Sequence, residues 1–205
     1  MSSTTLPRNV ARQDFYRTPA WATEAIVPVV RKGLSTRDRV VGKIPREEHW
    51  TILDAGAGDG AITRVVAAAF PESSVKGIEL DRKLVDAASL PILFEGDFFF
   101  EGREWESEVD AIVMNPPFSQ AREFVERALS VVEERDGVVV ALLRLAWMAG
   151  KSRAPFHREH PSDVYVLPRR PSFTGVGTDS ADYGWFVWRH GQIGGRWRVL
   201  DGEHS

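Results

Sequence analysis

The spacing of hydrophobic residues predicts alternating strands and helices over most of the chain. Short aliphatic runs bounded by glycine, proline or acidic residues are typical of buried strands, and apolar residues three or four positions apart are typical of helices. The predicted strands cover residues 51–55, 74–80, 92–94, 109–114, 138–143, 163–167 and 183–189. The predicted helices cover residues 19–31, 61–70, 81–89 and 119–134. This alternation predicts a mostly parallel sheet with right-handed crossovers.

The two ends of the chain depart from this alternation. No helical pattern separates the last two predicted strands, so we expect a C-terminal antiparallel hairpin joined by the loop 168–182. Near the N-terminus, Thr18 is a candidate N-cap and Pro19 a candidate first helical residue, while Pro28 is expected to kink the helix or end it early. The segment that follows, residues 32–50, is charged and irregular.

A glycine-rich turn lies between the first predicted strand and the next helix. It reads Leu53-Asp54-Ala55-Gly56-Ala57-Gly58-Asp59-Gly60. Glycines let the backbone turn sharply and let a ligand approach the main chain, but several nucleotide-binding folds share such a turn. The two carboxylates would repel a pyrophosphate, whereas they are compatible with the sulfonium and amino groups of S-adenosylmethionine (SAM). The turn therefore favours SAM over a dinucleotide.

Two further acids follow later strands. Glu79 ends the second predicted strand about twenty residues after the glycines, where a carboxylate can accept both ribose hydroxyls of an adenosine. Asp97 follows the third strand and is placed to accept from an adenine amino group, with Phe98 against the ring. A surface acid in the first case, and a turn aspartate beside a core phenylalanine in the second, are the alternatives.

The tetrapeptide Asn115-Pro116-Pro117-Phe118 directly follows the fourth predicted strand. Prolines end strand pairing and stiffen the backbone at the carboxyl end of the sheet, where ligands bind in open α/β folds. The Asn115 amide oxygen and the Pro116 carbonyl are two rigid acceptors that can hold both hydrogens of an aromatic amine. Such hydrogen bonds offset the positive charge that develops on the nitrogen during methyl transfer. A strand-terminating turn with a core phenylalanine is the alternative.

The composition of the chain excludes some kinds of site and bears on where the protein is located. The chain has 205 residues, a formal net charge of −3 and no cysteine, which excludes disulfides, thiolate metal sites and cysteine nucleophiles. No apolar run has the length of a signal peptide or a membrane span. We therefore expect a cytoplasmic protein without a metal site or a membrane contact. Residues 1–13 are expected to be flexible and residues 14–205 to form a single domain, because no linker divides them.

Taken together and in this order, these segments resemble the phage-type DNA N6-adenine methyltransferases, which belong to the amino-methyltransferase branch of the SAM-dependent enzymes. The matching segments are FYRTP at 15–19, LDAGAGDG at 53–60, GIELD at 77–81, GDFF at 96–99, NPPF at 115–118 and GTDSADYGWFVW at 177–188. They extend over roughly residues 14–190. NPPF is the most specific of them and the glycine turn the least.

The resemblance implies a Rossmann-like α/β fold with a seven-stranded sheet and a set of site residues. The residues implied in SAM binding are Tyr16, Thr18, Asp54, Gly56, Gly58, Glu79, Leu80, Asp97, Phe98 and Asn115. The implied catalytic motif is Asn115, Pro116, Pro117 and Phe118, with Phe118 stacked on a flipped base and Phe173 as a candidate for the opposite face. The candidate phosphate contacts are Lys151, Arg153, Arg158, Arg169 and Arg170, although a basic stretch of this kind is also typical of a solvated loop.

Several alternatives stay open. Enzymes that methylate guanine amines in ribosomal RNA or glutamine side chains resemble the chain in the same tetrapeptide, although the glutamine group usually has tyrosine where this chain has Phe118. Only the segments 15–19 and 177–188 favour DNA as the partner over RNA. A fold that binds SAM without catalysis and a dinucleotide oxidoreductase are the more distant alternatives. We expect no separate target-recognition domain, and a homodimer is left open.

Overall fold

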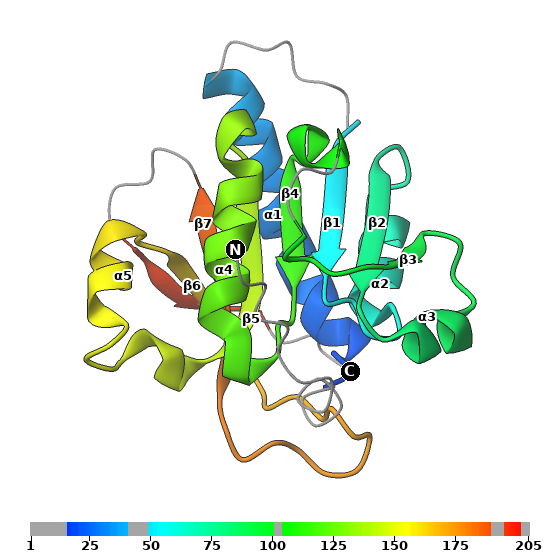
Figure 1. Cartoon of the computed structure of the whole chain (residues 1–205). Helices are drawn as coiled ribbons and strands as arrows, with labels where there is room; N and C mark the ends of the chain where they lie inside the picture. Colours follow the sequence, from blue (N-terminus) through cyan, green and yellow to red (C-terminus); the bar gives the residue numbers. More distant parts are fainter. Residues whose placement is uncertain (1–15, 41–48, 101–103, 190–194, 202–205) are drawn as a thin grey trace, which may run out of the picture.

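A computed structural model describes residues 16–40, 49–100, 104–189 and 195–201, and within them eight strands form one sheet (Figure 1). The strand order is β3-β2-β1-β4-β5-β7-β6-β8. The strands are β1 (Thr51–Ala55), β2 (Ser74–Glu79), β3 (Leu93–Glu95), β4 (Ala111–Met114), β5 (Val138–Arg144), β6 (Asp163–Val166), β7 (Tyr183–Arg189) and β8 (Trp197–Val199). The five strands β1 to β5 are parallel to their neighbours among themselves, and β7 is antiparallel to both β5 and β6. The predicted Rossmann-like fold with a C-terminal antiparallel hairpin is therefore confirmed.

Helices cover both faces of this sheet (Figure 1). The α-helices are α1 (Ala20–Val40), α2 (Ala61–Ala69), α3 (Arg82–Ala88), α4 (Ala121–Val132) and α5 (Ala154–Glu159). Short 3₁₀ turns cover Glu104–Glu108, Phe118–Gln120, Glu133–Arg135 and Leu145–Met148. The apolar side chains of α1 and α2 pack into one core cluster, and those of α4 and α5 pack into a second cluster on the opposite face.

Strand β7 contributes side chains to both core clusters. Successive side chains of a strand point to opposite faces of its sheet. Tyr183, Trp185 and Val187 accordingly lie in the cluster under α1, whereas Phe186 and Trp188 lie in the cluster under α4. All five side chains are buried because β7 is enclosed between β5 and β6 as well as between the two helical layers. The late aromatic residues of the sequence are thus largely core residues.

Helix α1 is longer than the sequence predicts. It begins at Ala20 and continues through Pro28 to Val40. Of the two alternatives for Pro28, a kink or an early end, the early end is wrong, and so is the prediction that residues 32–40 are irregular. Pro28 lies on the exposed side, where water can satisfy the carbonyl that loses its partner. On the other side, a buried apolar stripe at every fourth residue holds the helix against the sheet. The stripe consists of Ala22, Ile26, Val30 and Leu34.

The sheet has one strand more than the seven that the sequence predicts. Strand β8 pairs in parallel with β6 at the edge of the sheet. Its three residues, Trp197–Val199, are all exposed, and they alternate between apolar and polar side chains over only three positions. A pattern-based prediction needs alternation over about four or more residues, so this short edge strand gives too weak a signal to be predicted. No helix in the described part of the chain is long and apolar enough to cross a membrane.

Candidate active site

The parallel strands end at one edge of the sheet, and the motif residues gather there. The glycine turn follows β1, Glu79 ends β2, Asp97 follows β3 and Asn115 follows β4. In Figure 1 this edge is the lower one, where the loop between β6 and β7 and the start of α1 also lie. Ligands of open α/β sheets bind outside the carboxyl ends of the strands. The topology therefore brings together residues that are far apart in the chain, such as Tyr16 and Asn115, which are 99 positions apart.

The glycine turn is held in shape by strand β2. Gly56 has a φ of 69°, and a Cβ there would lie 3.2 Å from the Phe124 ring, so any side chain at this position meets both backbone strain and α4. The amides of Gly56 and Ala57 donate to the Ile78 carbonyl. The amide of Gly58 donates to Glu79 Oε2 at 2.7 Å. The predicted ribose-binding carboxylate thus also fixes the turn that it faces.

Asp54, at the end of β1, is buried beneath the turn. Its Oδ2 accepts from the amide of Thr63 at 2.9 Å and from the Thr63 hydroxyl at 2.7 Å, which ties the strand to α2. Its Oδ1 is buried without a hydrogen-bond partner among the described residues. Burial raises the pKa of Asp54 from 3.8 to about 7, with smaller contributions of the same sign from Glu79 and Asp59, although the hydrogen bonds from Thr63 oppose the shift.

This shift predicts pH-dependent cofactor binding. Between about pH 4 and pH 7 the folded protein holds a proton on Asp54 that the unfolded chain has released, so this carboxyl reduces stability as the pH rises through that window. A cationic ligand beside Asp54 favours the carboxylate. The affinity for SAM measured by calorimetry should therefore increase with pH up to about pH 7, by at most about tenfold per pH unit.

Asp54→Asn provides the control for this prediction. Asparagine keeps an oxygen for the two Thr63 hydrogen bonds but cannot release a proton. Its SAM affinity should vary less with pH, and without cofactor it should unfold at a higher temperature than the natural protein at about pH 8, but not at about pH 5. An unchanged pH slope in this variant would show that another group controls binding.

The aromatic residue beside Asp97 is not the one that the sequence analysis selected. Asp97 is exposed, and its Oδ1 accepts from the amide of Phe99 at 2.9 Å. Phe98 is only 4% exposed and stacks on Phe124 in the core under α4, with ring centres 5.5 Å apart. Phe99 is 37% exposed with its ring edge-on to Phe124. The exposed rings near Asp97 are therefore those of Phe99 and of Phe100, which is 63% exposed, and not that of Phe98.

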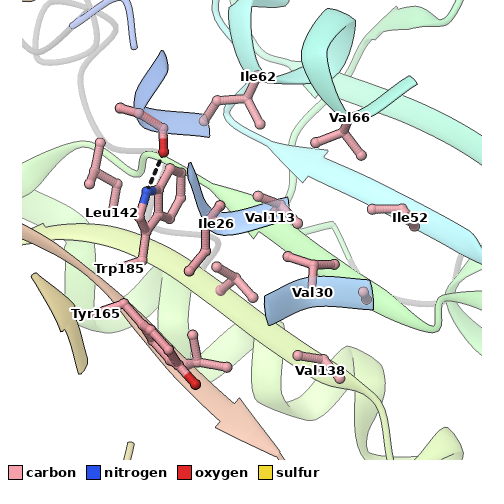
Figure 2. Close-up of a cluster of buried hydrophobic side chains, with 14 of the residues drawn as sticks. Ile26, Val30, Ile52, Ile62, Val66, Val113, Val138, Leu142, Tyr165 and Trp185 are labelled. Carbon is pink, nitrogen blue, oxygen red and sulfur yellow. Dashed lines mark hydrogen bonds between the residues drawn. The ribbon is translucent and has the colours of Figure 1, made fainter. Parts of the chain in front are cut away.

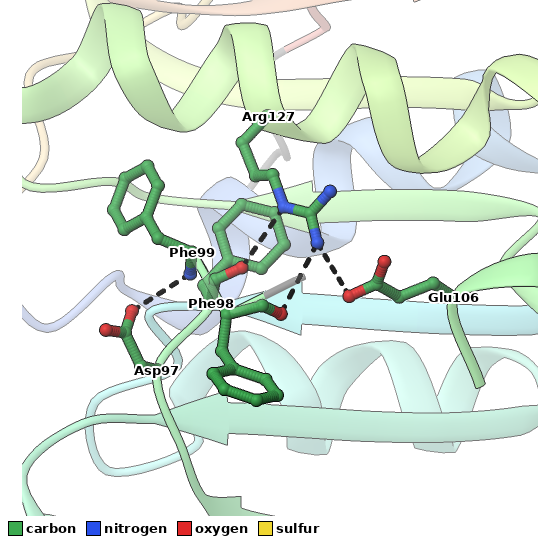
Figure 3. Close-up of polar contacts among 6 residues, drawn as sticks. Asp97, Phe98, Phe99, Glu106 and Arg127 are labelled. Carbon is green, nitrogen blue, oxygen red and sulfur yellow. Dashed lines mark hydrogen bonds and ion pairs between the residues drawn. The ribbon is translucent and has the colours of Figure 1, made fainter. Parts of the chain in front are cut away.

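Arg127 holds this segment in place from helix α4 (Figure 3). Its guanidinium donates to Glu106 at 2.6 Å, and to the carbonyl oxygens of Phe98 and Phe100 at 3.4 and 3.5 Å. The Arg127 side chain is only 10% exposed and that of Glu106 16%, so water screens the pair weakly. The loop after β3 is thereby fixed from the same helix that packs behind the glycine turn.

Asn115 has its amide group oriented by the segment before α1. Its Nδ2 donates to the Tyr16 carbonyl at 2.9 Å and to Thr18 Oγ1 at 3.0 Å. Because a carbonyl can only accept, these contacts fix which end of the amide is nitrogen. The remaining atom, Oδ1, is buried and has no hydrogen-bond partner among the described residues. The Thr18 hydroxyl therefore accepts a hydrogen bond from Asn115 and does not cap α1, which begins two residues later, at Ala20.

Four aromatic rings, one of them Phe118 itself, form a cluster at the end of the NPPF motif. Phe118 lies 5.0 Å from Tyr16 and 5.8 Å from Tyr183, measured between ring centres. Phe173, from the loop between β6 and β7, lies 5.3 Å from Tyr16 and 5.1 Å from Tyr183. The structure thus brings Phe173 to the same cluster as Phe118, where it is 9% exposed. The remaining motif residues differ in exposure: Pro116 is buried, Pro117 is half-buried and Leu80, after β2, is 57% exposed.

The basic residues are not equivalent in the structure. Arg153 donates to the carbonyl oxygens of Ala146, Trp147 and Ala149, which makes it a structural residue of the turn after β5. These hydrogen bonds occupy Nε and Nη2, so a phosphate contact by Arg153 would have to use Nη1. The other four cations lie nearer to solvent: Lys151 and Arg158 are exposed, Arg169 packs 4.6 Å over Trp21, and Arg170 pairs with Asp182 at 2.8 Å.

Some residues of this edge were not selected from the sequence. Arg17 pairs with Asp59 of the glycine turn at 2.8 Å, which connects the N-terminal segment to the cofactor side of the site. Arg144 lies 4.5 Å over the ring of Phe118 and is also close to Asp179 and Tyr183. Arg144 does carry a signal, because a charged residue directly after a buried strand lies at the ligand-binding edge of a parallel sheet.

Three buried oxygens at this edge have no hydrogen-bond partner among the described residues, and they show whether the edge fits SAM. They are Asp54 Oδ1 at the end of β1, Asp59 Oδ1 in the glycine turn and Asn115 Oδ1 directly after β4. Burying an unpaired acceptor is costly, so such atoms indicate donors or positive charge supplied by a ligand. SAM carries an ammonium and a sulfonium, and the acids beside the glycine turn match that charge. The residues present therefore fit this cofactor.

Comparison with known proteins agrees with the fold. Residues 38–135 match the methyltransferase small domain family. The release factor glutamine methyltransferase of Rhodopirellula baltica is 27% identical over 106 residues, which make up 47% of this chain and 36% of the relative. The chain thus spans little more than a third of the length of that relative.

Solved structures share the architecture at low sequence identity. The type I restriction-modification methyltransferase subunit of Streptococcus thermophilus has a TM-score of 0.62 and 16% identity, with 90% of this chain and 47% of that one covered. A candidate RNA methyltransferase from Pyrococcus horikoshii has a TM-score of 0.56 and 21% identity, with 92% and 93% covered. The chain therefore has the Rossmann-like fold of the SAM-dependent methyltransferases, and S-adenosylmethionine is the cofactor that this fold and the matched family imply.

Proposed function

We propose that this protein transfers a methyl group from SAM to the N6 amine of adenine in DNA. The observation that carries the proposal is the hydrogen bonding of the Asn115 side-chain amide. Its amide nitrogen is held by Tyr16 and Thr18, while its buried oxygen has no partner among the described residues. An acceptor oriented in advance and left unpaired is suited to an amine that donates a hydrogen bond.

The residues of the NPPF motif have distinct roles in this proposal. Asn115 Oδ1 and the Pro116 carbonyl accept the two hydrogens of the amine, which favours a pyramidal nitrogen and offsets its developing positive charge. The two prolines keep these acceptors rigid, so that little reorganisation is needed when the amine binds. When bound, SAM supplies an electrophilic methyl group that needs no further activation. No side chain has to act as a general base before the transfer, because the neutral nitrogen forms its bond to the methyl group as the S–CH3 bond breaks, and it releases its extra proton to solvent afterwards.

The aromatic cluster supports a planar substrate. A base inside a duplex cannot reach the acceptors, so the target nucleotide must be flipped out of the stack. Phe118 is half-buried at the end of the motif, and we assign its ring to stacking on the base. Phe173 is buried against Tyr16 and Tyr183, so we assign it to supporting this cluster. Lys151, Arg158, Arg169 and Arg170 are the candidates for phosphate contacts that position the nucleic acid.

Methylation of a glutamine amide is the second candidate. The relative from Rhodopirellula baltica is named a release factor glutamine methyltransferase, and a primary amide presents the same two hydrogens to the two acceptors. The ring cluster around Phe118 favours a broad aromatic base over a narrow amide. An exocyclic amine in RNA fits the same acceptors, so RNA is a further outcome of the test.

Transfer from radiolabelled SAM distinguishes these substrates. We expect label on unmethylated duplex DNA, and mass spectrometry of the digested nucleosides should identify N6-methyladenine. Total RNA and a glutamine-containing release factor should remain unlabelled in parallel reactions. Label on RNA or on the release factor alone would contradict the assignment to DNA. Asn115→Ala provides the control that any label comes from this site.

A further inference from the structure

A guanidinium lies against the phenylalanine of the catalytic motif. Arg144 is the last residue of β5 and therefore lies at the same edge of the sheet as Asn115. Its Cζ is 4.5 Å from the centre of the Phe118 ring, a distance at which a cation is attracted to an aromatic face. Its side chain is 43% exposed, so it lies at the rim of the site and not within the core.

Two residues near the start of β7 hold Arg144 in this position. Its Nε donates to the Tyr183 hydroxyl at 3.1 Å, and its Nη2 is 3.9 Å from Asp179 Oδ2. The Tyr183 hydroxyl donates to the same Asp179 oxygen at 2.9 Å. Burial raises the pKa of Tyr183 to about 12, so the hydroxyl keeps the proton that it donates.

Asp179 remains ionised within this network. Burial by itself would raise the pKa of Asp179, but the Ala181 amide, the Tyr183 hydroxyl and the charge of Arg144 together hold this pKa below its ordinary value. The pair therefore carries one positive and one negative charge. The negative charge of Asp179 offsets that of Arg144. This matters for catalysis, because an uncompensated cation near the target nitrogen would oppose the positive charge that develops there.

We propose that Arg144 is a positioning residue for methyl transfer: held by Tyr183 and Asp179, it covers one face of Phe118 and presents the opposite face to the target base. This inference rests on the proposed function, since only a stacked base gives the orientation of Phe118 a catalytic value. Asp179 has two roles: it helps to hold Arg144 in place, and its carboxylate offsets the charge of Arg144. The loop between β6 and β7, which contains Asp179, thereby becomes connected to the orientation of the base (Figure 1).

Arg144→Gln tests the positioning role. The variant should lower kcat for DNA methylation by about 10²-fold, because a misplaced base loses alignment with the methyl group. Its dissociation constant for SAM and its melting temperature should stay close to those of the natural protein. Arg31→Gln is the matched control: Arg31 also lies over a ring, 4.6 Å from Phe70, but it donates to Ala69 at the end of α2 and is remote from the motif. This control should keep full activity.

Further variants separate positioning from a simple phosphate contact. Arg144→Lys keeps the charge but loses the planar stack, so it should remain as slow as Arg144→Gln. Asp179→Asn and Tyr183→Phe should each lower kcat, and combining Asp179→Asn with Arg144→Gln should add little to the loss, as expected for coupled groups. Near-normal turnover by Arg144→Lys, with a weaker salt dependence of DNA binding in Arg144→Gln, would overturn positioning and indicate a phosphate contact.

The outcomes also distinguish this inference from the function on which it rests. If the natural protein labels DNA and Arg144→Gln turns over within about twofold of it, the inference fails while the proposed function stands. If the natural protein places no label on DNA, both fail. A loss in Arg144→Gln that appears only as a higher KM for DNA, with kcat unchanged, also contradicts positioning, because the base would then align normally once bound.

Discussion

Asn115→Ala should lower kcat for methyl transfer by about 10³-fold while SAM still binds. The substitution removes the buried oxygen that has no partner among the described residues and that we assign to the target amine. It acts on the transition state more than on the ground state, because the amine gains positive charge only during transfer. Single-turnover transfer to DNA and calorimetry with SAM would measure the two effects separately.

Asn115 also donates hydrogen bonds to the segment before α1, and a second variant measures the effect of losing one of them. The substitution to alanine removes the Nδ2 donor to Tyr16 and Thr18 together with the catalytic oxygen. Thr18→Val removes one acceptor of that donor and leaves Asn115 Oδ1 and the Tyr16 carbonyl in place. It should therefore cost only about tenfold in kcat. Equal losses in the two variants would mean that Asn115 serves mainly to hold the N-terminal segment.

Trp185→Ala should lower the free energy of unfolding by about 3–5 kcal/mol. Trp185 is fully buried in β7 between the sheet and α1, beside Ile26 and Leu142 (Figure 2). Its indole nitrogen donates to the Ala22 carbonyl at 2.8 Å, so the ring joins the C-terminal hairpin to the first helix. Alanine would leave a cavity and remove that hydrogen bond. Such a loss is a large fraction of the stability of a typical domain, which is about 5–15 kcal/mol.

Equilibrium urea unfolding measures this loss, and Trp197→Ala is the matched control. Trp197 lies on the edge strand β8 and is 72% exposed. Its removal should change the free energy of unfolding by no more than about 0.5 kcal/mol, because little apolar area is uncovered. Similar losses at the two tryptophans would contradict the assignment of Trp185 to the core that holds α1 on the sheet.

The order of elements was predictable because the central strands have strong local signals. A run such as Val138–Leu143 is apolar on both faces, which is typical of a buried parallel strand, and α4 has an amphipathic stripe. Prediction failed where tertiary contacts outweigh local preference. Helix α1 passes through Pro28 because its apolar stripe is buried against the sheet, and the exposed strand β8 is too short for its alternation to be detected.

The candidate site was predictable in part for a topological reason. The residues after parallel strands share one edge, so the glycine turn, Glu79 and Asn115 were expected to lie together, and they do. Which of two adjacent aromatic residues faces solvent was not predictable. Phe98 and Phe99 follow each other in the chain, and only the packing of α4 determines that Phe98 is buried and Phe99 exposed.

The amino-acid sequence by itself determined the alternating elements, the acid-flanked glycine turn and the stiff corner after the fourth strand, because each depends on residues that are neighbours in the chain. Only the tertiary structure decided the partners of those residues. It placed Thr18 against Asn115 and Arg144 against Phe118, and it engaged Arg153 with the turn after β5. Contacts between side chains distant in sequence depend on how the helices pack on the sheet, and local patterns do not contain that information.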